Sequence, residues 1–309
     1  MPSSVKLYSG TSSQYLAEKI AKAYGDKLGM ITHQQFSDGE LFVSYDESVR
    51  GMELFLIQST FPTADNLMQL MIMIDAAKRA SAKYVTAVVP YFGYARQDRK
   101  DKPRVAITAK LVANILSAAG ADRLMTCDLH AGQIQGFFDI PVDHLDGSAL
   151  FIPYIQSLKL ENLVIASPDV GGLTRARAYA KILNCELVVV DKHRKKANEI
   201  ASMQLIGNVE DANVILIDDL VDTGGTICKA AALLKEKGAK TVRAFCTHPI
   251  LSGKAYDNIN GSVLEEMVVS DTIPLKQESS KIKVITVANL FALAIKKVHE
   301  HGSVSSLFL

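Results

Sequence analysis

The chain has 309 residues, with 34 basic (Lys and Arg) against 33 acidic (Asp and Glu) side chains, which gives a formal net charge of +1. This balance supplies no electrostatic reason to expect a nucleic-acid partner or a membrane surface, and the hydrophobic content of 48% is that of a folded globular protein. The length favours two domains over one. The apolar run Leu67–Ile74 is interrupted by Gln69 and is much shorter than the roughly 20 residues of a membrane-spanning helix. We therefore expect a globular protein without a membrane segment.

Two features bear on the cellular compartment. The N-terminal sequence MPSSVKLYSG lacks a basic segment followed by an apolar one, so we expect no secretion signal. The four cysteines are scattered along the chain and form no CxxC pair, which favours buried, reduced thiols. Both features favour a cytoplasmic protein.

Strand-type segments alternate with amphipathic helical segments from one end of the chain to the other. The expected strands are Lys6–Tyr8, Glu53–Gln58, Tyr84–Pro90, Arg123–Asp128, Asn162–Ser167, Glu186–Asp191, Val214–Asp218, Thr241–Thr247 and Lys283–Val287. Several are almost entirely apolar, which is typical of strands buried on both faces of a parallel sheet. The expected helices run through Leu67–Ile74 with Thr63 or Asp65 as N-cap, through Ile107–Ile115 ended by Gly120, through Ile227–Leu234 ended by Gly238, and around Ala288–Glu300. The alternation predicts an α/β fold.

The two halves of the chain are weakly similar to each other. Arg123–Gly132 and Asn162–Gly172 each run from a strand into an aspartate, Asp128 or Asp169, and then into a glycine-containing turn. We therefore expect two similar domains, residues 1–146 and 147–309, each with a mainly parallel sheet flanked by helices. In such sheets ligands bind beyond the carboxyl ends of the strands.

The most informative motif is VILIDDLVDTGGT, which spans Val214–Thr226. A buried strand ends in the carboxylates Asp218 and Asp219, and a glycine-containing turn, Asp222–Thr226, leads directly into a helix. Glycines let consecutive N–H groups face one ligand, and the helix N-terminus adds partial positive charge, so the turn suits a phosphate monoester. The carboxylates can accept hydrogen bonds from vicinal hydroxyls, directly or through a divalent cation. Together these features predict a sugar-phosphate site.

A plain strand-to-helix turn with Asp222 or Thr223 as N-cap is the alternative interpretation. Such a turn does not need two carboxylates at a buried strand end, where they are costly to desolvate. Neither the GxxxxGK[ST] loop of P-loop kinases nor the GxGxxG dinucleotide motif occurs. The sugar-phosphate interpretation is therefore favoured.

Two segments of the first half could contact a nucleotide. FSDGE (Phe36–Glu40) is a turn between two apparent strands, and by its local pattern it could be a plain hairpin tip. YFGYARQDRK (Tyr91–Lys100) follows a strand, and its basic and aromatic side chains could neutralise a triphosphate and stack on a base. A solvated charged loop is the alternative for the second segment.

Two further features could bind metal and phosphate. His130 and Asp169 follow corresponding strands and could share a Mg²⁺ ion, although His130 could instead bind phosphate or be structural. KHRKKAN (Lys192–Asn198) follows a strand near the sugar-phosphate motif and could form a cationic lid. A solvated surface or a nuclear-localisation patch is the alternative for this basic run.

Taken together, these motifs resemble a known family. FSDGE, YARQDRK, DLHAGQIQGFFDIP, SPDVGG, KHRKKAN and IDDLVDTGGT occur in this order over most of the chain. The set is similar to the ribose-phosphate pyrophosphokinases, most closely to their phosphate-activated, ADP-inhibited class. The resemblance implies two phosphoribosyltransferase-like domains, assembly into a homo-oligomer that is usually a hexamer, and an ATP site between subunits.

The resemblance also implies roles for individual residues. These are Phe36, Asp38, Glu40, Arg96 and Gln97 for ATP, with the hairpin of Phe36 contributed by a neighbouring subunit; His130 and Asp169 for Mg²⁺; Asp218, Asp219, Asp222, Thr223, Gly224, Gly225 and Thr226 for ribose 5-phosphate; Lys192 and Arg194 of a mobile loop for catalysis; and Ser48, Arg50, Ser81, Arg104, Ser303 and Ser305 for the effectors inorganic phosphate and ADP. The implied reaction transfers the β,γ-diphosphoryl group of MgATP to the C1 hydroxyl of ribose 5-phosphate and releases AMP. Because the chain ends at Leu309, earlier than most relatives, the strength of ADP inhibition stays open.

Two other functions are compatible with part of this pattern. A phosphoribosyltransferase would use Asp218–Thr226 equally well but would not need the ATP-like segments. A non-catalytic regulatory partner of the synthetase would be expected to depart from the pattern at the nucleotide and sugar sites, which this chain does not. Formation of AMP from ribose 5-phosphate and ATP separates these alternatives.

Overall fold

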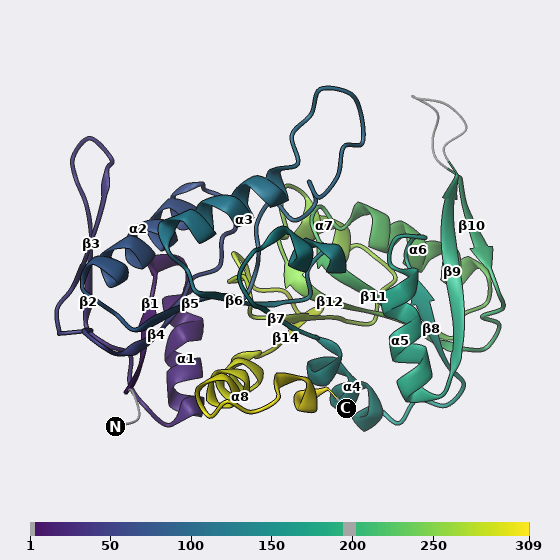
Figure 1. Cartoon of the computed structure of the whole chain (residues 1–309). Coiled ribbons are helices and arrows are strands. Elements are labelled where there is room, and N and C mark those ends of the chain that lie inside the picture. The colour runs from purple at the N-terminus through teal and green to yellow at the C-terminus, as the bar shows by residue number, and fades with distance from the viewer. Residues whose placement is uncertain (1–3, 194–201, 309) are drawn as a thin grey trace. The chain divides into compact units, whose positions relative to one another are not determined.

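A computed structural model describes residues 4–193 and 202–308 of the chain (Figure 1). The contacts divide the chain into two compact units, Met1–Gly147 with Val287–Leu309 and Ser148–Thr286. The break after Gly147 lies one residue beyond the expected boundary at residue 146. The grouping of the C-terminal segment with the first unit differs from the expected second domain, 147–309. The C-terminal segment groups with the first unit because α8 (Ala288–His299) packs against α1 (Gln14–Tyr24).

The first unit is a parallel sheet with helices on both faces (Figure 1). Its strand order is β1-β4-β5-β6-β7. The strands are β1 (Val5–Ser9), β4 (Glu53–Ile57), β5 (Tyr84–Val89), β6 (Arg123–Cys127) and β7 (Val142–Leu145). Helices α2 (Asp65–Arg79) and α3 (Thr108–Ala119) pack their apolar stripes on one face, where Leu70 and Leu116 share a core with Leu56 and Val85. The all-parallel sheet confirms the α/β fold for this half of the chain.

The helix boundaries test the capping predictions. The N-cap of α2 is Ala64, so the prediction of Thr63 or Asp65 was wrong. Thr63 Oγ1 donates to the Asp65 carboxylate at 3.3 Å rather than capping the helix. Gly120 ends α3 in the left-handed conformation, with φ of 108°, as predicted.

A two-stranded antiparallel hairpin projects from the first unit (Figure 1). It consists of β2 (Ile31–Gln35) and β3 (Leu41–Tyr45), and β3 packs against α2. Its turn is the FSDGE segment, with Gly39 at φ of 98°. The interpretation of this segment as a turn between two strands is confirmed.

The second unit contains a larger sheet, with order β10-β9-β8-β11-β12-β13-β14. The strands are β8 (Leu163–Ser167), β9 (Glu186–His193), β10 (Ser202–Ile206), β11 (Asn213–Val221), β12 (Thr241–Pro249), β13 (Met267–Ser270) and β14 (Ile282–Ile285). The edge strand β10 is antiparallel to β9, and the other pairings are parallel. The carboxyl ends of β8, β11 and β12 therefore lie side by side at one edge of the sheet, where a ligand site is expected.

Helices cover both faces of this sheet as well (Figure 1). They are α4 (Ser148–Ser157), α5 (Leu173–Leu183), α6 (Gly225–Glu236) and α7 (Ala255–Asn260). Val214 and Leu216 of β11 share a core with α6, whereas Ile215 and Ile217 pack with α5. This is the alternation expected of a central strand buried on both faces.

The remaining regular elements are the 3₁₀ turns η1 (Thr11–Ser13), η2 (Gly132–Phe137) and η3 (Val304–Leu307). Within residues 4–193 and 202–308, no helix has both the length and the apolar character needed to span a membrane.

Candidate active site

The acidic pair lies near the end of β11, on opposite faces of the sheet. β11 continues to Val221 rather than ending at Asp218 as expected, and it pairs with β12 over this extension. Its pairing with β8 ends at Leu216, so the edge of β11 that faces β8 has no ladder partner beside the acidic pair. Because side chains alternate along a strand, Asp219 follows Ile217 onto the face covered by α5, and Asp218 lies on the face covered by α6.

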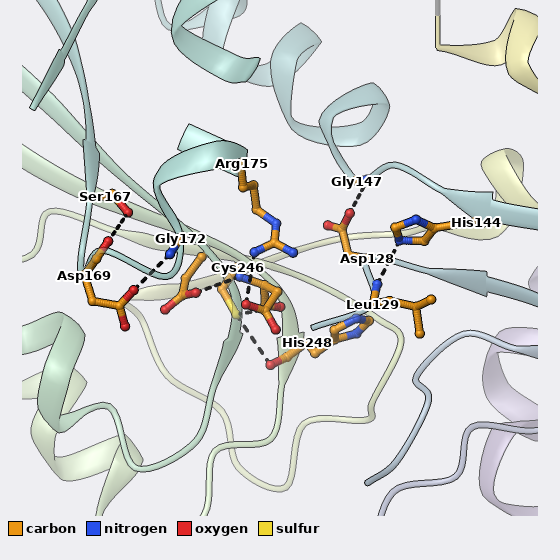
Figure 2. Close-up of polar contacts among 12 residues, drawn as sticks. Asp128, Leu129, His144, Gly147, Ser167, Asp169, Gly172, Arg175, Cys246 and His248 are labelled. Atoms are coloured by element: carbon orange, nitrogen blue, oxygen red, sulfur yellow. Dashed lines mark hydrogen bonds and ion pairs between the residues drawn. The ribbon is translucent and has the colours of Figure 1, made fainter. Parts of the chain in front are cut away.

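Asp219 is buried and makes several contacts. Its Oδ1 accepts a hydrogen bond from Arg175 Nη1 of α5 at 3.0 Å, and the two side chains are only 5% and 20% exposed. The carbonyl oxygen of Asp219 accepts a hydrogen bond from Cys246 Sγ at 3.5 Å, and the N–H of Asp219 donates to Asp218 Oδ1 at 2.9 Å. Figure 2 shows Arg175 pointing from its helix toward this strand end. The sequence reasoning missed Arg175 because no local pattern marks it.

The surroundings of Asp218 shift its pKa. Burial raises the pKa of Asp218 well above its ordinary value, and the nearby Asp219 and Asp169 carboxylates raise it further, whereas Arg175 acts in the opposite direction. The ionised form of Asp218 is therefore disfavoured until a further hydrogen-bond donor or a cation reaches it. Sugar hydroxyls and Mg²⁺ both meet that need.

The predicted phosphate turn lies at the start of α6. Gly224 adopts the left-handed conformation, with φ of 74°, and is the N-cap of α6 without any side-chain capping bond. Thr223 and Thr226 are exposed on the same turn. Because no side chain caps this end, the N–H groups and the positive end of the helix dipole can bind an anion.

Residues after β12 brace the phosphate turn. Ser252 donates through Oγ to the Asp222 carboxylate, and its N–H donates to the Asp222 carbonyl at 2.9 Å. Asn258 Nδ2 donates to the carbonyl oxygen of Thr223 at 2.9 Å. Asp222 is therefore engaged within the protein, which suits the support of the turn better than direct contact with an anion. No sequence pattern marks Ser252 or Asn258.

Asp169 lies in the turn that follows β8. Ser167 Oγ donates to its carbonyl oxygen at 2.6 Å, and Gly172 N–H donates to its Oδ1 at 2.9 Å, as Figure 2 shows. A Cβ atom at Gly172 would lie 2.9 Å from Ser167 Oγ, so this turn accommodates only glycine without rearrangement. A carboxylate has two oxygens, so the bond to Gly172 fixes Asp169 without excluding metal ligation.

The predicted lid begins within a strand. β9 extends through His193, beyond the expected end at Asp191, and the backbone of Lys192 pairs with Met203 of β10. The basic run therefore starts in an antiparallel pair. Arg194 lies outside the described residues, and the catalytic role of both cations stays a prediction.

The predicted nucleotide residues of the first unit lie on exposed loops. Phe36, Asp38 and Glu40 are all exposed at the hairpin tip, and the Phe36 side chain, 47% exposed, contacts the ring of Phe42 edge to face. Glu40 N–H donates to Asp38 Oδ1 at 3.1 Å, which fixes the turn. Gln97 Oε1 accepts a hydrogen bond from Thr108 Oγ1 at 2.5 Å, which fixes the Gln97 side chain.

The loop after β5 has buried aromatic residues at its start and exposed basic residues further along. Tyr91 and Phe92, at the start of that loop, are buried, whereas Arg96 is exposed. The loop is therefore anchored by its aromatic residues and presents its basic residues, rather than being solvated throughout.

The segment Asp128–His130 divides into a buried and an exposed part. Asp128 is 5% exposed, and its Oδ1 accepts from Gly147 N–H at 3.1 Å. Leu129 N–H donates to His144 Nε2 at 2.9 Å, so His144 supports this turn, a role that the sequence did not suggest. His130 is exposed.

The predicted metal pair spans the two units, since His130 belongs to the first and Asp169 to the second. In the part of the chain that the structure describes, no cluster of three or more His, Cys, Asp or Glu side chains has the geometry of a metal site. The assignment of His130 and Asp169 stays a prediction.

The predicted effector residues all belong to the first unit and are exposed: Ser48, Arg50, Ser81, Arg104, Ser303 and Ser305. The turn after Arg50 contacts the turn at Ser81, since Gly51 N–H donates to the Ser81 carbonyl at 2.9 Å. Ser303 and Ser305 share a hydrogen bond of 2.8 Å between their hydroxyls. The effector pocket itself stays a prediction.

The chain has two α/β units, each with a mainly parallel sheet, and in one of them an acidic strand end lies beside an uncapped helix N-terminus. These features define the class of phosphoribosyltransferase-like proteins. Residues 5–120 match the family described as the N-terminal domain of ribose phosphate pyrophosphokinase, and residues 193–309 match the phosphoribosyl synthetase-associated domain. The chain belongs to the ribose-phosphate pyrophosphokinase family.

Individual relatives cover almost the entire chain. A ribose-phosphate pyrophosphokinase of Porphyromonas gingivalis is 57% identical and one of Campylobacter jejuni is 56% identical; each alignment covers 98% of this chain, and 97% and 99% of the respective relatives. The crystal structure of phosphoribosylpyrophosphate synthetase from Mycobacterium smegmatis superposes with a TM-score of 0.92 at 40% identity, covering 97% of this chain and 100% of that one. The resemblance to the ribose-phosphate pyrophosphokinase family is thereby confirmed, whereas the phosphate-activated class stays a prediction. Similarity over both halves disfavours the phosphoribosyltransferase alternative.

Proposed function

We propose that the chain transfers the β,γ-diphosphoryl group of ATP to the C1 hydroxyl of ribose 5-phosphate, giving 5-phosphoribosyl 1-diphosphate and AMP. The observation that carries this assignment is the acidic end of β11 beside the uncapped N-terminus of α6. The match of the whole chain to ribose-phosphate pyrophosphokinases selects this reaction among those that use a sugar phosphate.

The sugar phosphate binds across these two features. Its phosphate accepts hydrogen bonds from the N–H groups of the turn at Gly224 and Gly225 and from the hydroxyls of Thr223 and Thr226. Its ring hydroxyls donate to the carboxylate of Asp218, where burial makes the unliganded anion unfavourable. Binding therefore satisfies a charge that the folded protein leaves poorly solvated.

The transfer needs alignment and charge compensation rather than a covalent enzyme intermediate. The C1 hydroxyl oxygen attacks the β-phosphorus of ATP and its proton is released to water. A new P–O bond forms at the β-phosphorus, and the bond to the oxygen between the α- and β-phosphorus atoms breaks, so that AMP leaves. Lys192 and Arg194 close over the transferred group and offset the charge that spreads onto its oxygens.

The nucleotide is held by the exposed loops of the first unit. Phe36 offers an exposed ring for stacking on the base, and Arg96 and Gln97 contact the phosphates. Phe36, Asp38 and Glu40 lie at the tip of a projecting hairpin, which supports their contribution to a site on a neighbouring subunit of a hexamer.

Magnesium is the expected cofactor, with Asp169 and His130 as its protein ligands. The oxygen donors at the sheet edge fit a hard divalent cation, and burial, together with the neighbouring Asp219 and Asp169 carboxylates, raises the pKa of Asp218. When bound, the ion neutralises phosphate charge. Inorganic phosphate as an activator, ADP as an inhibitor and a cytoplasmic location complete the proposal.

A direct assay tests the function. The purified chain is incubated with ribose 5-phosphate, ATP and Mg²⁺, and the products are separated by ion-exchange chromatography. We expect AMP and phosphoribosyl diphosphate in equal amounts, with a faster rate when inorganic phosphate is added. Formation of ADP instead of AMP would contradict the assignment.

A further inference from the structure

Arg175 makes a charged contact with the acidic pair, although no sequence motif singled it out. Its guanidinium lies 3.0 Å from Asp219 Oδ1, and the pair is largely buried, with exposures of 20% and 5%. A buried pair of this kind holds both side chains in one geometry, because separating the charges leaves each of them desolvated.

We propose that Arg175 is a positioning residue for ribose 5-phosphate, which holds Asp219 toward α5 so that Asp218 is the carboxylate that receives the sugar hydroxyls. The two aspartates therefore have different roles, whereas the sequence treats them alike. This inference rests on the proposed function, because it concerns the same sugar-phosphate site.

The strand geometry supports the division of roles. Asp219 lies on the sheet face covered by α5, where Arg175 reaches it, and Asp218 lies on the face covered by α6, which begins at the phosphate turn. The N–H of Asp219 donates to Asp218 Oδ1 at 2.9 Å, so a change at Asp219 is transmitted to the neighbouring carboxylate. Sugar hydroxyls and phosphate are then bound from the same side of the sheet.

The charge balance supports it as well. Asp169 and Asp219 both lie close enough to Asp218 to raise its pKa, yet the site must admit a phosphate dianion. Without the guanidinium, Asp219 would be a buried carboxylate that has lost its positively charged partner and lies beside a second carboxylate. It would then turn toward Asp218 or take up a proton, and either change disturbs the hydroxyl site.

The position of Arg175 also depends on the turn that contains Asp169. The bond from Gly172 N–H to Asp169 Oδ1 fixes the turn from which α5 begins at Leu173, and Arg175 lies in the first turn of that helix. Figure 2 shows this succession from Ser167 through Asp169 and Gly172 to Arg175. The first turn of α5 is therefore placed by the same residues that flank the proposed metal ligand.

The test compares full-length variants in the AMP assay. Arg175→Gln should raise the KM for ribose 5-phosphate roughly tenfold, the effect of losing a charged hydrogen bond, and leave the KM for ATP within about twofold. Arg175→Lys should recover part of the loss. The double variant Arg175→Gln/Asp219→Asn should bind ribose 5-phosphate no more weakly than Asp219→Asn, because the two residues act as one unit. The matched control is Arg177→Gln, which changes an exposed arginine of the same helix.

Two results would overturn the proposal: an Arg175→Gln variant that behaves like Arg177→Gln, or losses that add up in the double variant. If Arg175→Gln fails to fold, as judged by circular dichroism, the comparison of Asp219→Asn with the double variant carries the test, because the Asp219 carboxylate is replaced in both. Absence of AMP from the unaltered chain would contradict the proposed function instead. Calorimetric titration with ribose 5-phosphate would then compare the same variants without catalysis.

Discussion

Asn258 donates a hydrogen bond from Nδ2 to the carbonyl oxygen of Thr223, at 2.9 Å, and so ties α7 to the phosphate turn. The acceptor is a backbone group, so this bond sets the path of the chain immediately before Gly224. A loop that must present several N–H groups to one anion depends on such support, because each group contributes only when the backbone holds it in place.

Asn258→Ala should therefore weaken the binding of ribose 5-phosphate with little effect on ATP. We expect the KM for ribose 5-phosphate to rise about threefold to tenfold, the effect of one neutral hydrogen bond, in steady-state assays with each substrate varied in turn. Asn260→Ala is the matched control, since Asn260 lies on the same short helix but bonds to Ser279. Equal changes in the two variants would show that the effect is on α7 as a whole.

Gly224→Ala tests the left-handed conformation of the same turn. The new Cβ atom would lie 3.5 Å from Ala255 O and from Ile259 Cγ1, which is ordinary contact, so the cost is conformational rather than steric. At φ of 74° that cost is about 1–2 kcal/mol, measured as a loss in the free energy of unfolding in urea. Gly225→Ala is the control, because Gly225 lacks a positive φ and its Cβ would be 3.7 Å from Thr223 Oγ1. Unchanged stability in Gly224→Ala would contradict the assigned conformation.

The sequence predicted those parts of the site that follow one another along the chain. The apolar run of β11, the acidic pair and the glycines at the start of α6 are contiguous, so strand periodicity and turn chemistry were enough to place them. The contacts that organise them are not contiguous. Arg175 lies 44 residues from Asp219, and Asn258 lies 35 residues from Thr223. A polar side chain at such a separation has the same local pattern as a solvated one.

The domain boundary shows the same limit in the fold. The helix expected around Ala288–Glu300 is present as α8, with Phe291 and Ile295 buried, yet it groups with the first unit because it packs against α1. The apolar periodicity of α8 indicates that one face of the helix is buried, but it does not indicate which other element covers that face. The wrong N-cap of α2 has a related cause, since the Thr63 hydroxyl bonds to the Asp65 carboxylate instead of capping a backbone N–H of the helix.

Lys192→Ala should lower kcat by roughly 100- to 1,000-fold and change the KM values much less, because its contact strengthens as charge moves in the transition state. The measurement is initial AMP formation at saturating ribose 5-phosphate and ATP. Lys181→Ala, an exposed lysine of α5, is the control for loss of a positive charge elsewhere in the unit. Turnover close to that of the control would exclude a catalytic role for Lys192.

The Asp218 carboxylate should lower the free energy of unfolding, although it supports the binding of ribose 5-phosphate. Its pKa in the folded chain is raised by burial and by the neighbouring carboxylates, so between the ordinary and the raised value the folded state holds more protons than the unfolded one. The free energy of unfolding therefore falls as the pH rises through this window. Asp218→Asn removes that penalty, and we expect it to be more stable than the unaltered chain at neutral pH and equally stable at acidic pH below the window.

The same variant should bind ribose 5-phosphate roughly 10- to 100-fold more weakly, because a charged acceptor of sugar hydroxyls becomes a neutral one. In the unaltered chain, affinity for the sugar should fall as the pH is lowered and Asp218 takes up its proton. Calorimetric titrations and urea unfolding over a pH series measure both effects on the same samples. Asp211→Asn is the matched control, since Asp211 is exposed in the loop before β11. An Asp218→Asn variant that is less stable at neutral pH but binds the sugar normally would show that this carboxylate serves the fold and not the ligand.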